Sequence, residues 1–112
     1  PLACSAGRVV LKTLSAPGFL DDVNRKGDYI RNSISGWKIP IVTDVRGLGL
    51  MIGTEIAGKI KPFDVEKRCL EKGLCVSIAG ANVIRFLPPL TITDEETDAG
   101  LAIFRSVLEE YA

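Results

Sequence analysis

Residues 82–96, which read Asn-Val-Ile-Arg-Phe-Leu-Pro-Pro-Leu-Thr-Ile-Thr-Asp-Glu-Glu, contain a strand, its end and the start of a helix. The run from Asn82 to Leu87 is rich in residues that favour strands, and the two prolines after it would end a strand. Thr93 and Glu96 have the spacing of a capping box, so a helix is expected to begin directly after Thr93. The sequence thus predicts a strand followed closely by a helix near its C-terminus.

Hydrophobic spacing predicts the remaining elements. Apolar residues recur at helical intervals in the first third of the chain, whereas bulky and small residues alternate from Ile39 to Ile56, as in a half-buried strand. The glycines in that run suggest that another element approaches closely. Helices are expected at 1–14, 20–36, 62–73 and after Thr93, and strands within 39–56, at 74–78 and at 82–87, the last two joined as a hairpin. This order predicts a single α+β domain over residues 1–112, with helices on one face of a small, largely antiparallel sheet.

Composition excludes several classes of protein. The 14 basic residues equal the 14 acidic ones, whereas a nucleic-acid-binding domain usually has a basic excess. The chain has no histidine, and so lacks the commonest general acid or base and the commonest metal ligand. No apolar run approaches the roughly 18 residues of a membrane span. We therefore expect a globular domain without a nucleic-acid, membrane or metal partner.

The cysteines and lysines predict no reactive side chain. Cys4, Cys69 and Cys75 are odd in number and have no CxxC spacing, which argues against a disulfide framework or a zinc site. We expect all three to be small core residues of a cytoplasmic protein. The seven lysines stand in polar stretches, so we expect them all to be solvated. The chain alone thus shows no complete catalytic constellation.

Arg85 is the candidate site residue. It lies between apolar neighbours in a predicted strand, and a buried guanidinium is costly unless it is paired. Its planar fork fits a carboxylate or a phosphate. Arg85 is therefore either an anion receptor at a strand end or an arginine on the solvent face of an edge strand.

Arg46 begins the glycine-rich stretch 46–53, which does not match the GxGxxG pattern of a nucleotide loop. We interpret this stretch as a strand packed against another element. Arg46 itself either pairs with an acidic group across a domain or subunit boundary or is a solvated turn residue.

The motifs of the chain, taken in order, resemble those of a known family. They are Pro1-Leu-Ala-Cys4 opening a helix, Arg46-Gly-Leu-Gly-Leu-Met51, Glu71-Lys-Gly-Leu74, and Asn82-Val-Ile-Arg-Phe-Leu-Pro-Pro-Leu90 followed by Thr93-Asp-Glu-Glu96. Together they span nearly the whole chain and resemble the C-terminal part of class III aminotransferases, which are pyridoxal-phosphate enzymes of fold type I. Within that family the resemblance is closest to the members that use acetylornithine.

The resemblance implies an α/β parent enzyme that acts as a homodimer. Such an enzyme moves an amino group between N-acetylornithine, or a similar ω-amino donor, and 2-oxoglutarate in arginine biosynthesis. Ornithine or succinylornithine as donor remain alternatives. The chain would then be the C-terminal small domain, and residues 1–16 would end the helix that links it to a missing large domain. The absence of an initiator methionine before Pro1 fits this expectation.

The resemblance also implies one site residue. The family binds a substrate carboxylate with an arginine in the strand before Pro-Pro-Leu, and Arg85 occupies that position. The Schiff-base lysine and the other groups that hold pyridoxal 5′-phosphate would lie upstream. No residue of this chain is therefore expected to be catalytic, to hold the cofactor or to bind a metal, and the chain by itself is expected to be inactive.

Two further interpretations belong to other functional classes. The chain could be a non-catalytic α+β module in which Arg85 binds a small anion. It could also be an interaction domain that docks through the helix at 1–14 or through an apolar stripe on the next helix. That stripe consists of Leu20, Val23, Gly27, Ile30 and Ile34.

Overall fold

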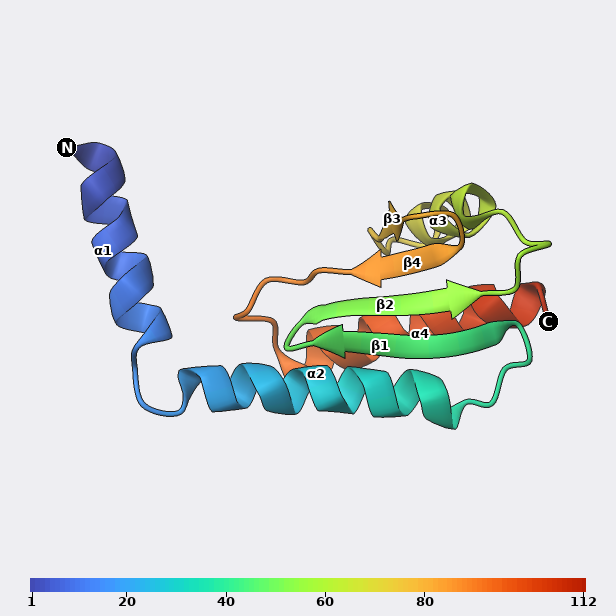
Figure 1. Ribbon diagram of the computed structural model, residues 1–112, viewed down its shortest axis with the longest axis horizontal. Coiled ribbons are helices and arrows are strands. Elements are labelled where there is room, and N and C mark those ends of the chain that lie inside the picture. The colour runs from blue at the N-terminus through green and yellow to red at the C-terminus, as the bar shows by residue number, and fades with distance from the viewer.

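Four antiparallel strands form one sheet, and two long helices pack with it around a common core (Figure 1). The computed structural model describes all 112 residues. In chain order the elements are α1 (Leu2–Leu14), α2 (Phe19–Gly36), β1 (Val42–Leu48), β2 (Met51–Ile56), α3 (Pro62–Glu71), β3 (Ser77–Ala79), β4 (Val83–Phe86) and α4 (Asp94–Glu110). The sheet order is β1-β2-β4-β3, so the α+β prediction is confirmed.

The core lies between one face of the sheet and the helices α2, α3 and α4. Along β2, alternate residues Ile52, Thr54 and Ile56 are fully buried, as the predicted period of two requires. Phe104 of α4 is also fully buried, and its ring meets the ring of Phe86 edge-on with centroids 4.6 Å apart. This inner face of the sheet holds the fold together through apolar contact.

The structure confirms the predicted starts and ends of α3 and α4. Thr93 caps α4, because its Oγ1 accepts a hydrogen bond from the backbone N–H of Glu96 at 3.1 Å. Pro62 stands at the start of α3, and Gly73 follows that helix with φ of 92°, a left-handed conformation that glycine adopts without strain. In α2 the predicted stripe is buried except at Leu20, which is 53% exposed near the start of the helix.

Strands do occupy most of the segment from Ile39 to Ile56, but the interpretation of residues 46–53 as one strand was wrong. The segment folds back on itself at Gly49, whose φ of 55° suits a tight turn, and β1 and β2 pair as a hairpin. The turn consists of Gly49 and Leu50. Leu50 is buried, whereas Leu48 just before the turn is 85% exposed. Alternation alone cannot show this reversal, because apolar residues continue through the turn on both sides.

The glycines of the hairpin do mark a close approach. A Cβ atom at Gly27 of α2 would lie 1.9 Å from the carbonyl oxygen of Gly49. Helix α2 therefore packs directly against the hairpin turn, and only glycine at position 27 permits that contact.

Two expectations about burial were wrong. Only Cys69 is a core residue, whereas Cys4 and Cys75 are exposed; burial raises the pKa of the Cys69 thiol to about 11. Lys26 is buried rather than solvated. Helix α1, which carries Cys4, has no buried residue and stands away from the sheet (Figure 1).

Candidate functional site

The face of the sheet opposite the core carries a row of four residues, one from each strand. The register places Arg46 of β1 opposite Gly53 of β2, Gly53 opposite Arg85 of β4, and Arg85 opposite Ser77 of β3. Directly paired residues point to the same face, so these four residues form one line across the sheet, which we call the outer row. The strand order thus brings together the two arginines that the sequence singled out.

Arg85 is half-buried and has no carboxylate partner. Its Nε donates a hydrogen bond to Ser77 Oγ at 3.2 Å, which fixes the side chain along the sheet. Five of the seven arginines form ion pairs, but none of these pairs involves Arg85. One interpretation placed Arg85 on the solvent face of an edge strand. Strand β4 has a neighbour on both sides, so it is not an edge strand. Its Nη donors remain available for a planar anion.

A hollow of about 520 Å³ opens beside the outer row. Gly53 lies between the two arginines and has no side chain to fill the space between them. A Cβ at this position would come within 3.1 Å of Val83 Cγ1. The hollow is lined by Arg46, Gly47, Leu48, Met51, Gly53, Ala79, Val83 and Arg85.

Arg46 forms its ion pairs within the domain. Its Nη1 donates to Asp44 Oδ2 at 2.6 Å and to Glu55 Oε2 at 2.9 Å. The hydrogen bonds to Asp44 and then to Glu55 raise the pKa of the Arg46 guanidinium above its usual value. Arg46 lies within β1, so it is not a turn residue, and both of its acidic partners come from the same hairpin.

The loop after β4 is held by a residue that the sequence analysis missed. Lys26 Nζ lies 3.4 Å from the carbonyl oxygen of Leu90 and 3.2 Å from Asp22 Oδ2. The loop that follows Arg85 is thereby anchored to α2. A signal was present in the sequence, because Lys26 adjoins Gly27 of the apolar stripe and precedes Ile30 by one helical turn.

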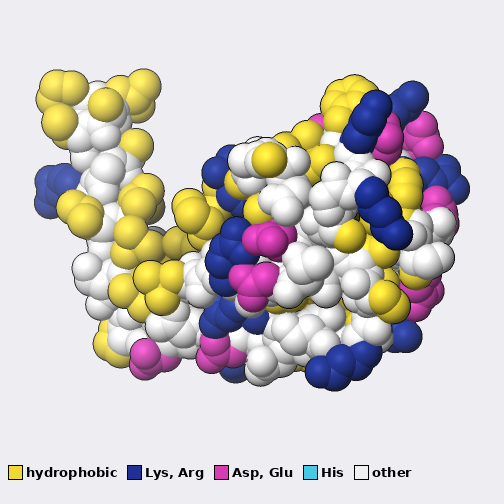
Figure 2. Space-filling view, turned by 45° about the vertical axis from the view of Figure 1, so that its right-hand side comes forward, with side chains coloured by type: hydrophobic (Ala, Val, Ile, Leu, Met, Phe, Trp, Pro, Cys, Tyr) yellow, Lys and Arg dark blue, Asp and Glu magenta, His cyan; other side chains and the backbone are white.

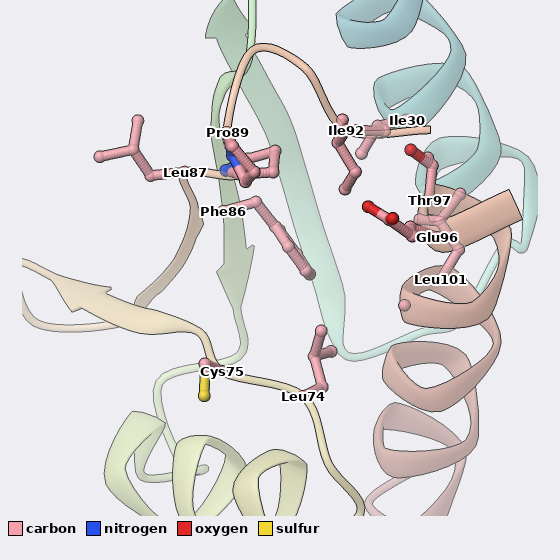
Figure 3. Close-up of a pocket in the computed structure, with 12 residues that line it drawn as sticks. Ile30, Leu74, Cys75, Phe86, Leu87, Pro89, Ile92, Glu96, Thr97 and Leu101 are labelled. Carbon is pink, nitrogen blue, oxygen red and sulfur yellow. The ribbon is translucent and has the colours of Figure 1, made fainter. Parts of the chain in front are cut away.

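A second cavity, of about 320 Å³, lies between the end of β4 and α4 (Figure 3). Its wall is mostly apolar and includes Leu74, Phe86 and Ile92. Glu96 contributes a carboxylate to the wall, and no lysine or arginine lines the cavity. The cavity therefore lacks a cation that would bind an acid, and the outer row is the candidate site.

Comparison with known proteins identifies the family of the chain. Residues 1–108 match the family model described as Aminotransferase class-III. The chain belongs to this family. Over 112 residues it is 41% identical to the acetylornithine aminotransferase of Caldanaerobacter subterraneus, in an alignment that covers 98% of the chain and 28% of the relative.

Solved structures of class III aminotransferases share the fold. The N-acetylornithine aminotransferase of Stenotrophomonas maltophilia superposes with a TM-score of 0.90 at 30% identity, over 99% of this chain and 32% of that one. The ornithine aminotransferase of Toxoplasma gondii gives a TM-score of 0.88 at 30% identity, over 99% and 27%. The predicted family and fold are therefore confirmed. The chain spans about 28% of the length of the first curated relatives that it matches.

Enzymes of the class III family depend on pyridoxal phosphate, which forms a covalent bond to a lysine. No lysine lines the hollow beside the outer row. The residues around Arg85 thus do not fit a covalent site for this cofactor, whereas the donors of the Arg85 guanidinium fit a planar anion. No group of three or more cysteine, aspartate or glutamate side chains is arranged to hold a metal ion. None of the helices has the length and hydropathy needed to cross a membrane.

Proposed function

We propose that the gene product carrying residues 1–112 moves an amino group between N-acetylornithine, or a similar ω-amino donor, and 2-oxoglutarate, and that Arg85 binds the carboxylate of its substrates. The half-buried, unpaired guanidinium of Arg85 carries the second part of this proposal. The relatives named acetylornithine aminotransferase support the first part.

The geometry suits Arg85 to this work. Ser77 holds Nε, which orients the plane of the guanidinium and reduces the entropy lost when a substrate binds. Two parallel hydrogen bonds from the remaining donors would then fix the carboxylate and so orient the amine or carbonyl end of the substrate. Amino-acid and keto-acid substrates both carry such a carboxylate, so one arginine serves both.

We further propose that residues 1–112 form the small domain of this enzyme and that residues 1–16 end a helix linking it to a large domain. The exposed apolar side chains of α1, visible in Figure 2, support this proposal, because a second domain would cover them. Leu2, Val9, Val10 and Leu11 are each at least 55% exposed. The cofactor would then be held by the large domain, and the enzyme would be a cytoplasmic homodimer that serves arginine biosynthesis.

Acceptors with and without a carboxylate test the role of Arg85. In the gene product, Arg85→Gln should lower kcat/KM for 2-oxoglutarate about 10- to 100-fold, which is the size of a lost charge-assisted hydrogen bond. An aldehyde acceptor without a carboxylate should be affected much less. Arg85→Lys keeps the charge but loses the planar fork. Its kcat/KM for 2-oxoglutarate should therefore lie between that of the unmodified enzyme and that of Arg85→Gln. An equal loss for both acceptors would contradict the proposed role.

The amino donor is tested by comparing initial rates with N-acetylornithine, ornithine and N-succinylornithine. The proposal expects N-acetylornithine to have the highest kcat/KM. A clear preference for ornithine would favour the function named for the Toxoplasma gondii structure instead. In parallel, the 112-residue chain should not attach pyridoxal phosphate covalently at one defined lysine, as mass spectrometry after borohydride reduction would show.

A further inference from the structure

The cavity between the end of β4 and α4 has the size and the lining of a site for a small molecule (Figure 3). Its volume of about 320 Å³ and its mostly apolar wall with few polar groups are typical of ligand pockets. It lies on the inner side of the sheet, because Phe86 of its wall also packs against Phe104 in the core. The cavity is therefore separate from the outer row.

The loop that forms one side of this cavity is held in place. Pro88 and Pro89 have fixed φ angles, and the N–H of Ile92 donates a hydrogen bond to the carbonyl oxygen of Pro89 at 3.0 Å. The contact of Lys26 with the carbonyl oxygen of Leu90 fixes the same loop to α2. The space is thus formed before a ligand arrives, which reduces the entropy lost on binding.

Glu96 is the only charged residue of the wall. In a capping box the acidic side chain usually accepts a hydrogen bond from the N–H of the capping residue. Here Thr93 caps the N–H of Glu96, but the Glu96 carboxylate forms no hydrogen bond and no ion pair. In Figure 3 it extends from α4 into the space that faces Phe86. The carboxylate is therefore free to bind a ligand.

The other polar groups of the wall leave few donors for an anion. Pro88 and Pro89 have no N–H, and the hydroxyl of Thr97 donates to the carbonyl oxygen of Thr93 at 2.9 Å. An inorganic cation would find no further oxygen ligands on the apolar side chains and would keep its water. The wall thus favours a ligand that donates hydrogen bonds at one end and is apolar at the other.

We propose that this cavity binds a small organic cation with an apolar body, such as an alkylammonium or an aryl amidinium. The cationic head pairs with the carboxylate of Glu96, and the apolar body fills the space beside Leu74, Phe86 and Ile92. The site is independent of the proposed function of Arg85, which lies on the other side of the sheet.

Benzamidine is the probe, and benzamide, which has nearly the same shape without the charge, is the comparison. Calorimetry should show saturable binding of benzamidine to the gene product, and benzamide should bind at least about fivefold more weakly. Glu96→Gln should weaken the binding of benzamidine about five- to tenfold and leave that of benzamide unchanged. Glu95→Gln is the matched control, because Glu95 lies in the same first turn of α4 but does not line the cavity.

Three outcomes would overturn the inference. The first is the absence of saturable benzamidine binding, which would also result if another part of the gene product filled the cavity. The second is an equal affinity for benzamidine in Glu96→Gln and the unmodified protein. The third is displacement of benzamidine by saturating 2-oxoglutarate, which would place the probe at the substrate site. Arg85→Gln should leave benzamidine binding unchanged, so failure of this inference is distinguishable from failure of the proposed function.

Discussion

The two faces of the sheet differ in how their residues are used. On the inner face, Ile52, Ile56 and Ile84 are fully buried and meet other apolar side chains. On the outer face, Arg46 and Arg85 flank a glycine beside an open hollow. Because the two sets alternate along the same strands, one strand both stabilises the fold and presents the site. Substitutions on the inner face should therefore change stability, and those on the outer face should change binding.

The largest effect is expected at Phe104, in the core beneath the inner face of the sheet. Phe104 is fully buried and lies against both Phe86 and Trp37, so Phe104→Ala removes a large ring and leaves a cavity. We expect it to lower the free energy of unfolding by about 3–5 kcal/mol. Urea unfolding followed by far-ultraviolet circular dichroism measures this change. Arg85→Gln is the matched outer-face variant, and a loss of similar size there would contradict the division between the faces.

A smaller loss of stability is expected at the contact between α2 and the hairpin. Gly27→Ala puts a methyl group where the carbonyl oxygen of Gly49 now lies, so the helix and the turn must separate. We expect a loss of about 1–3 kcal/mol, the usual range for overpacking. Gly36→Ala is the control, because a Cβ there meets nothing within 4 Å. Equal unfolding midpoints for the two variants would show that α2 does not press on the hairpin.

Ion pairs on the surface should contribute less to the free energy of unfolding than the packing at Phe104 or at Gly27. Their contribution should also depend on pH. Hydrogen bonds from Arg68 and then from Lys72 lower the pKa of Glu110 from its ordinary 4.5 to about 2. The folded-state pKa is the lower one, so this contribution to stability is present above pH 4.5 and is lost as the pH falls toward 2. Arg68→Gln should raise the pKa of Glu110 in a carbon-detected NMR titration, whereas Arg105→Gln should leave it unchanged.

The sequence predicted most elements because their signals are local. The cap at Thr93, the proline at the start of α3 and the glycine after it each satisfy backbone groups within one turn, so neighbouring residues decide them. The turn at Gly49 was missed for a related reason. The turn packs against Gly27, which lies 22 positions earlier in the chain and is brought close only by folding.

The site could be predicted only in part for the same reason. Arg85 stood out because a charge inside an apolar run is unusual, and its place in a known motif suggested a role. The outer row could not be predicted, because it depends on β4 pairing with β2 rather than with β3 alone. That pairing places Gly53 between Arg46 and Arg85, although 39 positions of sequence separate the two arginines.

The smallest effect on stability is expected at Gly53, where the two faces can be distinguished most directly. Gly53→Ala adds a methyl group that favours the extended backbone but comes within 3.1 Å of Val83 Cγ1. These contributions oppose each other, so the free energy of unfolding should change by less than about 0.5 kcal/mol. The same methyl group would stand on the outer face, in the row between Arg46 and Arg85, and would narrow the hollow, so KM for 2-oxoglutarate should rise. A variant that loses stability while KM stays constant would show that Gly53 serves packing. The outer face would then have no role in binding that is separate from stability.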